Sequence, residues 1–343
     1  MTPRVVCFGE IMLRLSPPGF ERLLQSPALK ATFGGGEANV AVSLAHFGVS
    51  SAYVTRVPSN AIGDAAVRTL RAEGVDVQHV QRGGSRLGIY FAETGASQRA
   101  STVLYDRAQS AISEIQPGSV DWNSAVTGAA WLHWTGITPA LSAGAAACTR
   151  EAIDAARRAG ARVSVDLNFR RKLWSESQAQ AVMRPLVTGS DLLIANEEDL
   201  QSVLGIAVAG VNLTAGQVDP AAYRAAAEQV ARDFGVARVA ITLRESLSAS
   251  ENGWSAVLFD AASKTFTHSQ HYVIRVVDRI GGGDSFAAGL LYGLIQNWAA
   301  DAALRFAVAA SALKHTVPGD FNRVSVSEVQ QLAGGDASGR VQR

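Results

Sequence analysis

Three consecutive glycines precede an aspartate and an apolar helical segment late in the chain. The stretch reads DRIGGGDSFAAGLL over residues 278–291, with Gly281, Gly282 and Gly283 followed by Asp284. Glycines before a helix leave backbone N–H groups free to bind an anion at the positive end of the helix dipole. No Lys-Ser/Thr pair follows them, which excludes a Walker A loop, and a dinucleotide-binding fingerprint belongs after the first strand instead.

Asp284 has two interpretations. A carboxylate in the first turn of a helix commonly only stabilises that helix. An aspartate inside a phosphate-binding loop would repel the phosphate unless it faces the attacking hydroxyl, and that arrangement suits a general base in phosphoryl transfer. The spacing alone favours the stabilising cap.

A second glycine run, Gly34–Gly36, precedes another helical pattern in FGGGEANVAVSLAHFG at 33–48. Such a run lets the backbone approach a ligand closely, and Asn39 in the following turn could hydrogen-bond hydroxyl groups. The alternative is a flexible hinge between two parts of the chain. The residues are compatible with both.

Polar residues also follow four predicted strands. In open α/β sheets, ligands bind beyond the carboxyl ends of the strands, so these residues predict a site at one edge of the sheet. They are Gly136 and Thr138, then Asp166, Asn168 and Arg170, then Asn196, Glu197 and Asp199, and finally Thr242 and Arg244.

The elements that would position these residues alternate between strand and helix. The alternation predicts an α/β fold, a doubly wound and mainly parallel sheet flanked by helices on both faces. Strands are expected at 5–8, 52–57, 131–136, 162–168, 191–196 and 239–243, and helices at 37–47, 61–73, 144–159, 176–187 and 221–234.

Two stretches, 11–33 and 85–116, carry alternating patterns and predict antiparallel strands outside the main sheet that form a small β lid. We expect a single domain over residues 1–333, with an exposed insertion at 205–220 and a mobile tail at 334–343.

The composition is that of an ordinary globular protein, with 343 residues, 48% hydrophobic and 18% charged. A net charge of +1 gives no basic field for nucleic acid, and no apolar stretch is long enough to span a membrane. Cys7 and Cys148 lack metal-ligand spacing. A cytoplasmic, reduced protein is the simplest interpretation.

Over nearly its whole length the chain resembles the ribokinase-like (PfkB) carbohydrate kinases. GGGEANVAVSLAHFG looks like the N-terminal signature of that family and DRIGGGDSFAAGLL like its C-terminal one, in the right order. The resemblance implies ATP and Mg²⁺ as cofactors, Asp284 as the catalytic base, and Gly281 to Gly283 as the anion hole for the transferred phosphoryl group.

The resemblance also implies a nucleotide site that includes Asn196, Thr242, Arg244, Gly281 and Gly283. Asn196-Glu197-Glu198-Asp199 resembles the Asn-x-x-Glu magnesium motif but ends in aspartate, so a water could bridge Asp199 to the metal. Arg244 stands where many relatives have glycine and could contact the phosphates directly. Arg279 stands where the signature favours a small residue or proline, and no role is assigned to it.

Within the family the chain is most similar to 2-keto-3-deoxygluconate kinases. The similarity is carried by GIYFAE, YDRAQSA, TGITPAL, DLNFRRKLW and PGDFN. It implies a substrate site of Gly35, Asn39, Tyr90, Tyr105, Arg107, Ile137, Arg170 and Asp284. A sugar acid needs a cationic partner for its carboxylate, which Arg107 and Arg170 would supply, although Arg170 could instead belong to a solvated basic run with Arg171 and Lys172.

The expected function is therefore ATP-dependent phosphorylation of 2-dehydro-3-deoxy-D-gluconate to its 6-phosphate. The alternatives are a kinase of the same fold acting on a neutral sugar such as fructose or on a related deoxy-ketogluconate, and a non-catalytic sugar-acid binding module. Asp284 argues against the binding module, which needs no carboxylate beside a phosphate. Lids of this family often pair between copies, which is compatible with a homo-oligomer.

Overall fold

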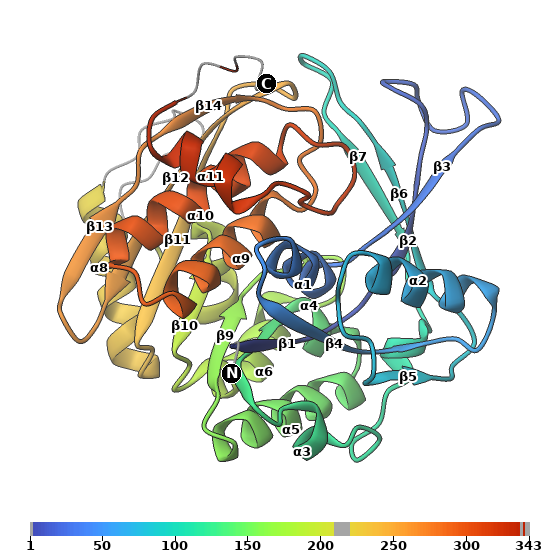
Figure 1. Cartoon of the computed structure of the whole chain (residues 1–343), viewed down its shortest axis with the longest axis horizontal. Helices are drawn as coiled ribbons and strands as arrows, with labels where there is room; N and C mark the ends of the chain where they lie inside the picture. The colour runs from blue at the N-terminus through green and yellow to red at the C-terminus, as the bar shows by residue number, and fades with distance from the viewer. Residues whose placement is uncertain (1–2, 209–219, 337–338, 340–343) are drawn as a thin grey trace.

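The computed structural model describes residues 3–208, 220–336 and 339 (Figure 1). Most of the predicted insertion at 205–220 and of the predicted tail at 334–343 lies outside these residues. No helix in the described ranges is both long and apolar enough to cross a membrane.

A twisted ten-stranded sheet forms the centre of the molecule, in the order β13-β12-β11-β10-β9-β8-β1-β4-β5, with β14 paired to β12. Within this order, each adjacent pair of strands from β5 through to β11 is parallel, which confirms the predicted fold class. They are β1 (Arg4–Phe8), β4 (Ser50–Val57), β5 (Val80–Arg82), β8 (Ala129–Thr135), β9 (Arg162–Asp166), β10 (Leu192–Ala195) and β11 (Arg238–Ser246). After β1 the chain adds β4 and β5 on one side of that strand, and it then adds β8 and the later strands on the other side. A topological switch point therefore lies between β1 and β8.

Helices cover both faces of this sheet because successive residues of the parallel strands are buried on opposite sides. In β1, Val5 and Cys7 join one hydrophobic core, and Val6 and Phe8 join the other. The first core packs against α1 (Gly36–His46), α2 (Ala61–Ala72), α9 (Gly282–Ile295), α10 (Ala300–Lys314) and α11 (Val326–Ala333). The second packs against α3 (Trp122–Ala125), α5 (Ala143–Arg158), α6 (Glu176–Val187) and α8 (Pro220–Phe234).

Short helical turns complete the connections of the sheet. Two of them directly follow central strands, namely α4 (Ile137–Leu141) after β8 and α7 (Glu197–Asp199) after β10. The others are a 3₁₀ turn, η1 (Ala111–Glu114), and a π-helical turn, η2 (Leu200–Leu204).

A separate four-stranded sheet, in the order β3-β2-β6-β7, stands beside the main sheet at the upper right of Figure 1. It consists of β2 (Met12–Ser16), β3 (Lys30–Gly34), β6 (Gly88–Glu93) and β7 (Thr102–Asp106), which lie in the two segments expected to form the lid. The expectation that its strands are all antiparallel is wrong for β2 and β6, which pair in parallel. The chain between these two strands runs through α1, β4, α2 and β5, and so long a crossover imposes no hairpin geometry on them.

The strand pattern did not predict the far edge of the main sheet, where β12 (Glu251–Asp260) pairs antiparallel with β11 and also with both β13 (Thr265–His268) and β14 (Tyr272–Arg275). No helix separates these strands, so the strand–helix alternation that predicts βαβ units carries no signal for them. β11 and β12 together form one end of the cleft described below.

Candidate active site

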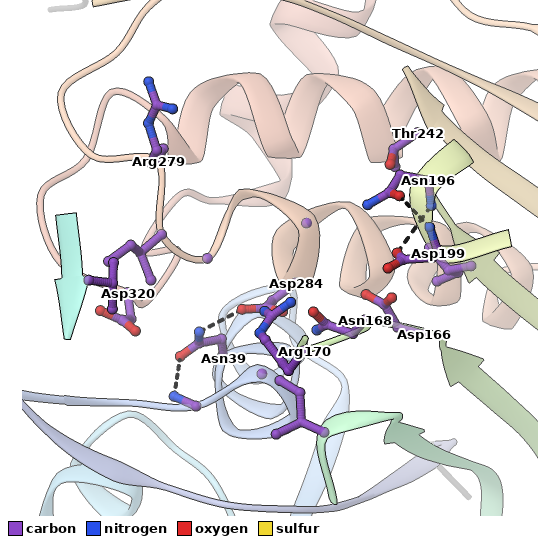
Figure 2. A pocket seen from close by; sticks show the side chains of 18 of the residues that line it. Asn39, Asp166, Asn168, Arg170, Asn196, Asp199, Thr242, Arg279, Asp284 and Asp320 are labelled. Carbon is purple, nitrogen blue, oxygen red and sulfur yellow. Dashed lines mark hydrogen bonds between the residues drawn. The ribbon is translucent and has the colours of Figure 1, made fainter. Parts of the chain in front are cut away.

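A cleft of about 490 Å³ lies at the carboxyl ends of the central strands, between the main sheet and the small sheet. Of the residues predicted for catalysis, substrate, nucleotide and metal, all except Gly282 line it, and Figure 2 shows side chains from α1, α9 and several strand ends facing one another across it. The strand-end residues Gly136 and Thr138 do not line it, and Thr138 Oγ1 instead donates to Glu37 at 2.7 Å. The predicted residues on its walls are Gly35, Asn39, Tyr90, Tyr105, Arg107, Ile137, Arg170, Asn196, Asp199, Thr242, Arg244, Gly281, Gly283 and Asp284.

Asp284 lies in the first turn of α9, but its carboxylate is held by α1. Oδ2 accepts a hydrogen bond from Asn39 Nδ2 at 2.6 Å, and Asn39 Oδ1 accepts in turn from the Gly35 N–H at 3.3 Å (Figure 2). Burial raises the pKa of Asp284 to about 6, although the Asn39 bond acts in the opposite direction. The carboxylate is thus oriented from across the cleft, which the cap interpretation does not require.

The three glycines before Asp284 are needed for different reasons. Gly281 has a φ of 88°, and a Cβ there would lie 2.1 Å from the Asp320 carbonyl oxygen. A Cβ on Gly282 would lie 2.3 Å from the His315 ring, whereas one on Gly283 would meet no atom within 4 Å. Packing therefore excludes side chains from the first two positions, while the third opens toward the cleft beside the free N–H groups of the helix end.

Carboxylates at the ends of β9 and β10 lie close to Asp284. Burial raises the pKa of Asp166 well above its usual value, and the charges of Asp199 and Asp284 raise it further. Asp199 accepts hydrogen bonds from the N–H groups of Phe169 at 2.9 Å and Asn196 at 3.3 Å, and burial raises its pKa to about 6. The side chain of Asn196 is held by the same turn, because its Oδ1 accepts a hydrogen bond from the Asp199 N–H at 2.8 Å.

Within the described ranges, no group of three or more His, Cys, Asp or Glu side chains is placed to hold a metal ion. The protein alone therefore provides no complete metal cage there. Mg²⁺ is commonly held by only one or two carboxylates, together with substrate phosphates and water. Two mutually repelling carboxylates at the end of a phosphate-sized cleft fit that arrangement.

The two arginines expected to bind a carboxylate differ in their surroundings. Arg107 is buried and paired with Glu10, to whose Oε2 its Nε donates at 2.8 Å. Arg170 donates a hydrogen bond from Nη1 to the Phe169 carbonyl at 3.0 Å, and its side chain forms no ion pair with a described residue. Of these two arginines, Arg170 is thus the one whose guanidinium is not held in an ion pair.

Asp320 lines the same cleft and was not among the predicted site residues. Its Oδ2 accepts from the Tyr90 hydroxyl at 2.5 Å, and its Oδ1 pairs with Arg14 at 2.8 Å. Arg14 also pairs with Asp278 at 2.7 Å. Asp320 follows a helix and a turn, so the strand-end rule could not find it; the PGDFN motif was the available signal.

Asp166 and Asn168 were noted at the end of β9 but not assigned a role, and both line the cleft. Asn168 adopts a left-handed backbone conformation with a φ of 40°. This uncommon conformation for a residue with a side chain occurs often at functional sites.

Thr242, Arg244 and Arg279 also line the cleft, and Figure 2 shows Thr242 beside Asn196 and Arg279 well apart from both. Thr242 Oγ1 lies 3.4 Å from the carbonyl oxygen of Ala195, while Arg244 is exposed on β11. Arg279, for which the sequence suggested no role, donates from Nη2 to the Ala249 carbonyl at 2.9 Å.

Comparison with known proteins gives consistent results. The model of a family described as pfkB family carbohydrate kinase matches residues 2–325. A 2-dehydro-3-deoxygalactonokinase of Haloferax volcanii is 35% identical over 338 residues, covering 98% of this chain and 99% of that protein. The crystal structure of a 2-dehydro-3-deoxygluconokinase from Thermotoga maritima has a TM-score of 0.93 at 47% identity, covering 97% of this chain and 100% of the other.

The same fold also occurs with other substrates. A fructokinase from Xylella fastidiosa, solved with bound ATP, has a TM-score of 0.77 at 21% identity, covering 97% of this chain and 99% of the other. At that identity the likeness concerns the fold alone. The fold therefore does not distinguish an acidic from a neutral sugar, and the residues of the cleft must do so.

Proposed function

Because the chain belongs to the pfkB family of carbohydrate kinases, we propose that it transfers the terminal phosphoryl group of ATP to the primary hydroxyl of 2-dehydro-3-deoxy-D-gluconate, forming the 6-phosphate. One observation carries the proposal. A buried carboxylate oriented by Asn39 shares a cleft with Arg170, a guanidinium that forms no ion pair with a described residue and whose charge acts on Asp166, Asp199 and Asp284 from a greater distance. This pairing suits a substrate with a hydroxyl at one end and a carboxylate at the other.

In this proposal Asp284 accepts the proton of the attacking hydroxyl. A base is most effective when its pKa lies near the working pH, and the raised pKa of about 6 meets that condition while keeping the group ionised at pH 7. The N–H groups around Gly281 to Gly283 stabilise the negative charge of the phosphoryl group during transfer.

Arg170 binds the carboxylate of the sugar acid, while the lid residues enclose the remainder. Arg107, neutralised by Glu10, serves as a hydrogen-bond donor and holds Tyr105, whose ring lies 5.2 Å from its guanidinium carbon. Gly35, Asn39, Tyr90 and Ile137 complete the substrate site, and Asp320 joins them as an acceptor for a substrate hydroxyl.

The nucleotide lies toward Asn196, Thr242 and Arg244, with its phosphates at the glycine loop. Asp166 and Asp199 are the residues that would hold Mg²⁺. When bound, the ion would supply positive charge against the phosphates.

The C4 epimer of the keto acid, 2-dehydro-3-deoxy-D-galactonate, is a second candidate substrate. The observation that favours it is the similarity along the whole chain to the galactonokinase of Haloferax volcanii. A neutral ketose is disfavoured because it has no carboxylate that could accept a charge-assisted hydrogen bond from Arg170.

The test is an ADP-release assay with the keto acid, its C4 epimer, gluconate, fructose and ribose. We expect the highest kcat/KM with the keto acid. A higher kcat/KM with fructose or ribose would contradict the proposal, a higher value with the epimer would support the second candidate, and no ADP release with any sugar would favour the binding module.

A further inference from the structure

Two cationic side chains stand at the nucleotide end of the cleft without an acidic partner. Arg244 and Arg279 both line the cleft, and neither forms an ion pair with any residue in the described ranges. In Figure 2 the side chain of Arg279 lies apart from Asn39, Arg170 and Asp284 and points away from them. Arg279 is therefore remote from the proposed sugar site.

Arg279 is anchored on one side only. Its Nη2 donates to the Ala249 carbonyl at 2.9 Å, and the Ala249 N–H donates to the Ser97 carbonyl of the lid hairpin at 2.8 Å. Ser97 is fixed to the same turn by a second bond, from its N–H to Ser250 Oγ at 2.9 Å. The guanidinium is thus held in place before any ligand binds, which reduces the entropic cost of binding.

The remaining donors of Arg279 are unused. Its Nε is buried and has no hydrogen-bond partner. The nearest acid in sequence, Asp278, is already bound to Arg14 at 2.7 Å and accepts from the Gly319 N–H at 2.9 Å. Burial lowers the pKa of Arg279 and the charge of Arg244 lowers it further, and the opposing charge of Asp278 does not offset the two effects.

We propose that Arg279 and Arg244 together bind the terminal phosphates of the nucleotide, with Arg279 as a phosphate ligand in its own right. The proposal rests on the proposed kinase function. Arg279 lies two residues before Gly281, the charge of Arg244 acts on Arg279, and both cations line the cleft together with Gly281 and Gly283. A guanidinium can bind two phosphate oxygens at once, which suits the β- and γ-phosphates.

The test compares the binding of AMP, ADP and a non-hydrolysable ATP analogue by calorimetry, without sugar. The variant is Arg279→Gln, which removes the charge but keeps an N–H donor for Ala249. We expect the Kd of ADP and of the analogue to rise about tenfold or more, as for the loss of a charge-assisted hydrogen bond, and that of AMP to change less than about threefold. Inorganic tripolyphosphate should compete with ADP in the wild type and much less in the variant.

The matched control is Arg275→Gln, since Arg275 is 92% exposed and paired with Glu251 at 3.7 Å. It should leave all three Kd values unchanged. If Arg279→Gln raises the Kd of AMP, ADP and the analogue equally, Arg279 only positions the Ala249 turn. If none of the three Kd values changes, Arg279 has no role in nucleotide binding. Either result overturns the proposal.

Because the binding assay contains no sugar acid, its result does not depend on whether the proposed substrate is correct. The expected ADP and AMP pattern without phosphorylation of the keto acid would contradict only the proposed function. A wild-type protein that binds none of the three nucleotides would contradict both.

Discussion

At the scale of single residues, the site depends on which charges are neutralised and which are left free. Asp284 has one oxygen held by Asn39, while burial keeps its pKa near 6. Arg107 is paired with Glu10, whereas Arg170 has no ion pair among the described residues. These contacts assign different roles to residues of the same type, and three expected outcomes follow from them.

Asp284→Asn should lower kcat by at least about a hundredfold, because asparagine cannot accept the hydroxyl proton. The Kd of the keto acid should change little, since the amide keeps the shape of the carboxylate and one oxygen that can accept the hydrogen bond from Asn39. Steady-state kinetics and calorimetry measure the two effects. A variant with nearly normal turnover would remove Asp284 from the role of base.

The pKa of about 6 for Asp284 also sets a pH dependence. Activity should fall roughly tenfold per pH unit below about 6, because protonation removes the base.

The stability of the protein should depend on pH in the opposite direction. Between about pH 4 and 6 the folded protein binds the proton on Asp284 more tightly than the unfolded chain does, so the contribution of this group to the free energy of unfolding falls as the pH rises. Urea denaturation of the wild type and of Asp284→Asn should show this difference between them, and parallel curves would contradict the buried, pKa-shifted carboxylate.

Arg170→Ala should raise the KM for the keto acid by roughly tenfold to a hundredfold, as expected for the loss of a charge-assisted bond, with the KM for ATP nearly unchanged. The neighbouring Arg171 is the control, because it is exposed and paired with Glu176 and Glu198. Arg171→Ala should leave both KM values within about twofold. If both variants raise the KM for the keto acid equally, Arg170 belongs to a general basic surface instead.

At the scale of elements, the glycine loop and the start of α9 form one unit with two requirements. The backbone at Gly281 needs a left-handed conformation and room for the Asp320 carbonyl, whereas Gly283 is already helical and faces open space. Glycine at 281 is therefore needed for the chain to fold, whereas glycine at 283 is needed only if a ligand approaches the backbone there.

The two glycines should therefore respond differently to alanine. Gly281→Ala should destabilise the protein by about 1–3 kcal/mol or more, because an L-residue is strained at this φ and its Cβ would clash. Gly283→Ala should leave the free energy of unfolding unchanged or slightly higher, since alanine is the better helix former, and yet lower kcat/KM for ATP by about tenfold or more. Denaturation and kinetics on both variants check this, and a Gly283→Ala enzyme with normal kcat/KM would show that no phosphate approaches that position.

At the scale of the whole molecule, a buried ionic cluster joins the small sheet to the main domain. Arg14 in β2 reaches Asp278 before α9 and Asp320 after α10. Lys314, also buried, donates to the Asp278 carbonyl at 3.2 Å and to the Val317 carbonyl at 3.2 Å. The cluster fixes the lid strand and the glycine loop relative to each other.

Arg14→Met should lower the free energy of unfolding by about 3–5 kcal/mol, because it leaves two buried aspartates without their cation. The control is Arg305→Ala, which removes an exposed i,i+4 pair with Asp301 at 3.0 Å and should cost less than about 0.5 kcal/mol. Urea denaturation measures both. Similar losses in the two variants would contradict the structural importance of the cluster.

The sequence by itself determined the features that depend on local pattern. The α/β fold, the positions of the parallel strands other than β5, the two lid segments and the glycine–aspartate loop follow from short-range periodicity and from the conformations open to glycine. The motifs that carry the family resemblance are equally local, and they gave roles to many of the residues that line the cleft but to none of Asp166, Asn168, Arg279 and Asp320.

Only the tertiary structure decided how those residues are paired. Asp284 is oriented by Asn39, Arg107 is neutralised by Glu10, and Tyr90 binds Asp320, each across a long separation in the chain. The parallel pairing of β2 with β6 and the position of Arg279 beside Ala249 were decided in the same way. The physical reason is that neutralisation, burial and the resulting pKa shifts depend on distances through space, which sequence spacing does not encode.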